Sequence, residues 1–268
     1  MKKLSQLSKL ILISALSVSI IMSGCKKDDE IVAPELPPME SLLMVFSDFD
    51  TDKTTKAVSN HYNWGTAFAH VSVWNVFISL GMAIPIASYA EALKQQPVYL
   101  GENKWEWQYD VTVGAVGYSA ALVTERISNE EFTAAMYVTF SGLTPVEGFK
   151  WFEGTVRYDH THALWTLYEN PENPSPMIEI EWNRDWDADT GDITYTNVTN
   201  DEESGSFLSY SFDPALQYDA SYTISLHAGL TLIEWDRETK AGRIQSQEKF
   251  GDLNWYCWNS DLQNDVCP

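Results

Sequence analysis

"KWEWQYDVTV", residues 104–113, is the stretch that decides the fold class, because its side chains alternate between two kinds. The apolar or aromatic set is Trp105, Trp107, Tyr109, Val111 and Val113. The residues between them are polar or charged, beginning with Lys104 and Glu106. A period of two residues is that of a β-strand with one buried face and one solvated face. The stretch therefore predicts a half-buried strand.

Similar segments follow this stretch at short spacings as far as the C-terminus. They lie at residues 116–126, 131–141, 148–158, 162–169, 176–183, 192–199, 206–212, 219–227, 230–237, 242–249 and 253–258. Turn-forming sequences such as "ENPENPSP" (169–176) and "NDEESG" (200–205) separate them. The gaps are too short for crossover helices, so the strands must pair antiparallel. A meander of about twelve strands leaves exposed edges unless it curls, which favours an all-β barrel or half-barrel.

A long uncharged run, "AFAHVSVWNVFISLGMAIPIASYA", covers residues 67–90 ahead of the strands. Its length would suit a membrane-spanning helix. Asn75, Gly81 and Pro85 make that interpretation poor, and apolar residues lie on every side of the helix. We therefore predict a helical segment at about 64–94 that is buried on all sides by protein. We expect it to break between Gly81 and Pro85 and to fill the curled sheet.

The first residues of the chain have the parts of a signal peptide. Lys2, Lys3 and Lys9 give a positive start, and an uncharged apolar core follows over residues 10–22. This core is too short to cross a bilayer as a mature helix. Residues 1–24 are therefore predicted to be a signal peptide.

The sequence "MSGC" at residues 22–25 resembles the lipobox of bacterial lipoproteins. That resemblance implies removal of the signal peptide and acylation of Cys25. The following "KKDDE" (26–30) resembles the Lys-acid-acid signal that Bacteroidota place after the acylated cysteine of surface lipoproteins. It implies a lipid-anchored outer-membrane protein exposed at the cell surface. An ordinary secretion signal followed by a charged, solvated tail is the alternative.

The composition of the rest of the chain limits its possible organisation and partners. Residues 25–39 are charged and rich in proline, which predicts a tether, and residues 40–268 suit a single β-rich domain that includes the helical segment.

The formal net charge of −21 argues against a nucleic-acid partner. It also opposes attraction to anionic lipid, so acyl chains would make the membrane contact. No cofactor is predicted, because phosphate-loop and zinc motifs are absent from the sequence.

Once Cys25 is acylated, Cys257 and Cys267 are the remaining cysteines of an exported chain. Exported chains form disulfides, so these two are predicted to pair and to hold the C-terminal segment against the domain. The loop that they close is short, so the expected stabilisation is roughly 2–3 kcal/mol. A metal site is the poorer interpretation, because a second Cys or His pair is missing nearby.

Two patterns could bind metals. His160 and His162 stand two residues apart, which on a strand places both imidazoles on one face, with Asp159 able to orient one of them. A hairpin tip with solvated histidines is the alternative.

The acids Asp185, Asp187 and Asp189 begin like a calcium loop, but Gly191 falls one place late, which favours a turn. Asp48, Asp50 and Asp52 form a second pattern of the same kind.

Tryptophans recur on the predicted strands. Those chosen as candidate ligand-binding residues are Trp105, Trp107, Trp151 and Trp182, with Trp165 and Trp235 in similar positions. Core packing explains them by default, but a large curled sheet leaves room for a cavity that could hold an apolar ligand or a glycan.

Two hypotheses of function result. The first is a non-enzymatic surface lipoprotein whose β-domain binds an apolar small molecule, a glycan or a protein partner. The second is an extracellular carbohydrate-active hydrolase that uses the paired acids Glu179 and Glu181.

Overall fold

The computed structural model describes residues 32–44, 46, 49, 60–113, 116–142, 145–226 and 229–267. The predicted signal peptide, Cys25 and the acids at 48, 50 and 52 lie outside the described residues. Residues from Ala33 onward belong to one compact unit. Among the helices in the described part of the chain, none has the length and apolar character needed to cross a membrane.

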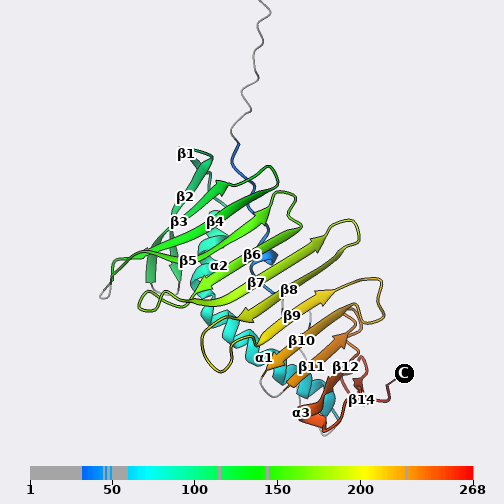
Figure 1. The fold of residues 1–268 in the computed structure, drawn as a ribbon. Helices are drawn as coiled ribbons and strands as arrows, with labels where there is room; N and C mark the ends of the chain where they lie inside the picture. The colour runs from blue at the N-terminus through cyan, green and yellow to red at the C-terminus, as the bar shows by residue number, and fades with distance from the viewer. Residues whose placement is uncertain are drawn as a thin grey trace, which may run out of the picture. The chain divides into compact units, whose positions relative to one another are not determined.

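The described residues of this unit form an open sheet of fourteen antiparallel strands that pair in chain order (Figure 1). The strands are β1 (Val98–Gly101), β2 (Lys104–Val113), β3 (Val116–Arg126), β4 (Glu131–Phe140), β5 (Val146–Arg157), β6 (His162–Tyr168), β7 (Pro176–Asp185), β8 (Thr190–Asn197), β9 (Phe207–Phe212), β10 (Ala220–Leu226), β11 (Gly229–Trp235), β12 (Gly242–Ser246), β13 (Tyr256–Trp258) and β14 (Asn264–Asp265). The predicted antiparallel meander is confirmed, and it is a curled sheet rather than a closed barrel. The sequence pattern does not predict the two edge strands, β1 and β14.

The alternation that predicts the strands is the alternation of burial in the sheet. β2 has the predicted bounds, and Trp105 and Trp107 are buried on the face that packs against the helices. The strand predicted at 242–249 is shorter, because β12 ends at Ser246 and one helical turn, α3 (Gln247–Phe250), follows it. Gly251, with a φ of 81°, ends that turn in the left-handed region that glycine adopts easily.

Two consecutive helices cover one face of the sheet. They are α1 (Tyr62–Gly81) and α2 (Ala83–Ala92), and Met82 separates them, which confirms the predicted break. α1 contacts β12, β13 and β14, whereas α2 contacts β2, β3 and β4, so the pair runs across the strands (Figure 1). Asn63 fixes the start of α1, because its Nδ2 donates a hydrogen bond to the Cys257 carbonyl at 2.8 Å.

The prediction that the whole helical segment is buried on all sides is wrong for α1. Val73 is 69% exposed and Val76 is 58% exposed, whereas Tyr89 and Ala92 of α2 are fully buried. The physical reason is the open sheet, which covers one side of α1 and does not close around the other. α1 therefore presents apolar side chains to solvent.

Residues 33–39, which the sequence predicts to be part of a tether, pack into the compact unit that begins at Ala33. Pro34 and Pro37 are buried, and the Tyr89 hydroxyl donates a hydrogen bond to the Pro37 carbonyl at 2.7 Å. The Tyr195 hydroxyl of β8 donates to the Leu42 carbonyl at 2.9 Å, and burial raises the pKa of this hydroxyl. The sequence pattern misses this packing, because proline-rich segments have no periodicity that marks a buried side.

Candidate functional site

A cleft with a volume of about 740 Å³ lies along α1. Thr66, His70 and Val73 belong to the helical wall of this cleft. Leu226, at the end of β10, and Lys249, in α3, line the cleft from outside this helix. The volume falls within the range of small-molecule binding sites, which is roughly 300–1,000 Å³.

The helical wall is continuous because its residues recur with the spacing of helical turns. Tyr62, Thr66, Ala69 and Val73 stand three or four residues apart, so their side chains share one side of α1. From Tyr62 to Val73 this side extends roughly 16 Å along the helix axis. Ala69 and Val73 are apolar, and the polar groups of the other two residues are the hydroxyls of Thr66 and Tyr62. The wall is therefore mostly apolar.

His70 places a polar group in this apolar wall. Its Nε2 atom is buried and has no hydrogen-bond partner among the described residues. Burial lowers the pKa of the imidazole below 6.5, and the positive charge of Lys249 lowers it further, against the opposing effect of Glu248. The lowered pKa favours the neutral form of the ring. Because buried polar atoms in proteins almost always have partners, the unpaired nitrogen marks a candidate binding position.

Lys249 supplies positive charge to the same cleft. Its Nζ atom lies 2.6 Å from the Glu248 carboxylate, and both side chains are exposed to solvent in part. The hydrogen bond from Lys249 lowers the pKa of Glu248. An ion pair between partly exposed neighbours contributes little stability, so Lys249 can exchange Glu248 for another anion at small cost.

The tryptophans chosen from the sequence do not line this cleft. Trp105, Trp107 and Trp182 are buried in the core between the sheet and the helices. Trp151 is half-buried and packs against Phe149, with the ring centroids 5.0 Å apart. Ligand binding by these four residues stays a prediction.

The sequence pattern does not point to the residues that form the cleft, because it predicts that every side of the helix is buried. His70 is the feature of the sequence that could have indicated the cleft. His70 and Tyr89 are the two titratable residues in the run from 67 to 90.

The two histidines proposed as metal ligands each have an oxygen partner. His160 Nε2 lies 3.0 Å from the Glu35 carbonyl oxygen, and His162 Nδ1 lies 2.9 Å from the Asn183 side-chain oxygen. Throughout the described ranges, no group of three or more His, Cys, Asp or Glu residues is suited to hold a metal ion. The metal site stays a prediction without a third ligand.

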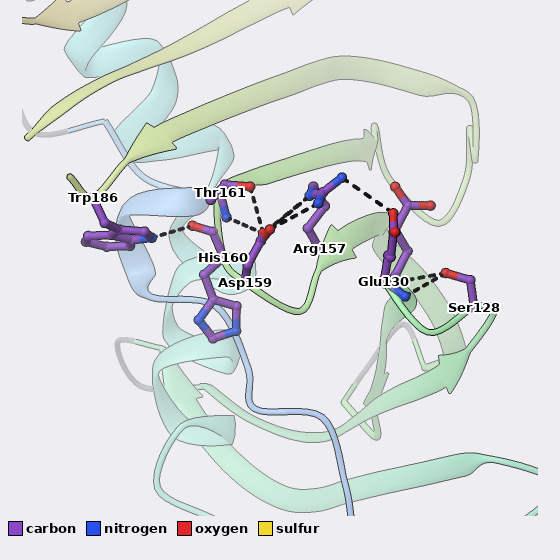
Figure 2. A network of polar contacts seen from close by, with 8 residues as sticks. Ser128, Glu130, Arg157, Asp159, His160, Thr161 and Trp186 are labelled. Carbon is purple, nitrogen blue, oxygen red and sulfur yellow. Dashed lines mark hydrogen bonds and ion pairs between the residues drawn. The ribbon is translucent and has the colours of Figure 1, made fainter. Parts of the chain in front are cut away.

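His160 belongs to a polar network that joins neighbouring hairpin tips (Figure 2). Arg157 lies between Asp159 and Glu130, at 3.0 Å and 3.9 Å from their carboxylates. The hydrogen bond from Arg157 lowers the pKa of Asp159 to about 2. Trp186, at the next hairpin tip, donates from Nε1 to the His160 carbonyl at 3.0 Å. These contacts link the ends of β3–β4, β5–β6 and β7–β8, and we interpret the network as structural.

The acidic residues singled out from the sequence between 179 and 189 lie in a turn and on the exposed face of β7. Asp185 accepts hydrogen bonds from the backbone N–H groups of Asp187 and Ala188, each at 2.9 Å, which is the geometry of a side-chain-stabilised turn. Glu179 and Glu181 are exposed on the sheet face opposite the buried Ile180.

The sulfur atoms of Cys257 and Cys267 lie 2.08 Å apart, as the predicted disulfide requires. Cys257 is the middle residue of β13, so the bond would tie the end of the chain to this strand.

The cleft beside α1 is the candidate site, because it combines an apolar wall with the His70 Nε2 atom, which has no hydrogen-bond partner in the described part of the chain. Comparison with protein-family models, curated proteins and solved structures finds no match to this chain.

Proposed function

We propose that this protein is a non-enzymatic surface lipoprotein whose β-domain binds an apolar small molecule in the cleft beside α1. The observation that carries the proposal is the exposed apolar side of α1, on which Val73 is 69% exposed and faces a cleft of about 740 Å³. Covering such surface stabilises a complex by about 25 cal/mol for each Å² of apolar area removed from water. The ligand would lie in an open cleft rather than in an enclosed cavity lined by tryptophans.

The test is uptake of a neutral fluorescent apolar probe, N-phenylnaphthylamine, by the purified protein. We expect saturable binding, and we expect Val73→Asp to weaken it about tenfold or more, because a charge in an apolar contact must be desolvated. The melting temperature should barely change, since Val73 is largely exposed. Probe fluorescence and thermal unfolding measure the two quantities.

The matched control is Val98→Asp in β1, where the valine is 63% exposed and lies in another part of the sheet. This variant should bind the probe like the unchanged protein. Absence of saturable uptake would refute the proposal, and so would an equal loss in both variants.

The proposed location at the cell surface is supported by residues 22–30, which resemble the lipobox and export signal described above. The cysteine pair at disulfide distance suits the oxidising compartments that exported proteins reach. The acyl chains on Cys25 would anchor the domain, and residues 26–32 would connect the anchor to the compact unit that begins at Ala33.

Replacing the three acids at residues 28–30 by alanine is expected to keep the protein on membranes but to protect it from protease added to whole cells. The reason is that these acids would direct export to the outer face, whereas Cys25 would supply the anchor. Immunoblotting after protease treatment measures the effect. Alanine at Glu172, Glu179 and Glu181 makes the same change in charge and should leave accessibility unaltered. Unchanged accessibility of the 28–30 variant would contradict the export signal.

A further inference from the structure

We infer that the ligand of the cleft is a single-chain amphiphile with a carboxylate head, such as a long-chain fatty acid. Its tail would lie along the apolar side of α1, and its head would bind at His70 and Lys249. This inference rests on the proposed function, because it names the class of ligand that the same cleft takes.

The shape of the apolar wall argues for an extended tail. Tyr62, Thr66, Ala69 and Val73 form one row along the helix, and this row extends roughly 16 Å. Leu226, at the end of β10, also lines the cleft and adds apolar surface from outside the helix. A flexible chain laid along the helix axis from His70 toward Tyr62 would contact Ala69, Thr66 and Tyr62, whereas a compact ring system would cover about one turn.

Charge decides where the head would lie. Of the described residues that line the cleft, Lys249 carries the positive charge and Glu203 the negative charge. Glu203 accepts a hydrogen bond from the Ser206 hydroxyl at 3.1 Å, in the loop between β8 and β9. The charges that act on His70 are those of Lys249 and Glu248. An anionic head is therefore favoured near His70 and Lys249 and disfavoured near Glu203.

Hydrogen bonding narrows the class of head further. A carboxylate only accepts hydrogen bonds, and it needs partners when it leaves water. The Lys249 ammonium donates hydrogen bonds, and the neutral imidazole of His70 carries one N–H group. An alcohol would use His70 but leave Lys249 with Glu248, and an amine would be repelled by Lys249.

The net charge of −21 does not prevent this binding. Exposed charges more than about 8 Å apart are largely screened at physiological ionic strength. A lysine in the cleft therefore acts on the head more strongly than distant acids do.

The experiment compares lauric acid, lauryl alcohol and lauryl amine as competitors that displace N-phenylnaphthylamine from the purified protein. We expect lauric acid to bind about tenfold more tightly than the other two, because a charge-assisted hydrogen bond is stronger than a neutral one. Lys249→Gln should remove this preference by weakening lauric acid about tenfold and lauryl alcohol less than about twofold. His70→Leu should weaken both the acid and the alcohol, since either head would bond to the ring.

Lys94→Gln is the matched control, because Lys94 is also an exposed lysine paired with a nearby acid, Glu91, at 2.8 Å. It should leave all three affinities unchanged. Equal binding of the three competitors, with no effect of Lys249→Gln, would overturn the carboxylate inference and leave the proposed function standing. Failure to take up any probe would refute the proposed function itself. Binding to neutral phosphatidylcholine vesicles without binding of free lauric acid would identify a membrane surface as the occupant and would also overturn the inference.

Discussion

Replacing Trp235 by alanine is expected to lower the free energy of unfolding by about 3–5 kcal/mol, the cost of removing a large buried aromatic side chain. Trp235 is 1% exposed, and its ring stacks on Tyr222 with the centroids 4.9 Å apart. Phe49 meets the same ring edge-on, also at 4.9 Å. Urea unfolding followed by far-ultraviolet circular dichroism measures the loss without relying on tryptophan fluorescence.

On β12, the residue that pairs with Trp235 has no side chain that could move into the space that the substitution leaves. Gly242 stands directly opposite Trp235 on β12, and its backbone approaches so closely that an added Cβ would lie 2.8 Å from the Trp235 Cβ. The control is Trp186→Ala, because Trp186 is 51% exposed and contributes mainly a hydrogen bond and a cation–π contact with Arg184. Its loss should be about 1 kcal/mol or less. A similarly small loss for Trp235→Ala would contradict a packed aromatic core.

Replacing Cys25 by alanine is expected to move essentially all of the protein from the membrane fraction to the soluble fraction. Acyl chains would be the anchor, because each buried CH₂ contributes about 0.8 kcal/mol and stable anchoring takes more than one chain. Fractionation followed by immunoblotting measures the redistribution.

Ser17→Ala, a small change within the predicted signal peptide, should leave the protein on membranes. Metabolic labelling with palmitate should mark this control and the unchanged protein, but not the Cys25→Ala variant. If the Cys25→Ala variant stayed on membranes, another part of the chain would have to be the anchor.

Much of the sheet could be predicted from the sequence. The bounds of β2 and β3 match the predicted segments 104–113 and 116–126, and the break at Met82 lies between the two helices. These features depend on local order: strands repeat with a period of two, and a helix is interrupted close to glycine and proline. Short edge strands lack this signal, which is why β1 and β14 could not be predicted.

The sequence by itself determined an antiparallel meander with a long apolar helix, because periodicity states which residues can be buried. The sequence could not determine which elements of the fold cover these residues. Whether the sheet closes depends on twist summed over many strands, and the open sheet leaves Val73 exposed. The cleft joins α1 to Leu226 and Lys249, which are far away in the chain, so only tertiary packing brings them together. The same packing places Trp105, Trp107 and Trp182 in the core, where a strand pattern alone could equally have lined a cavity.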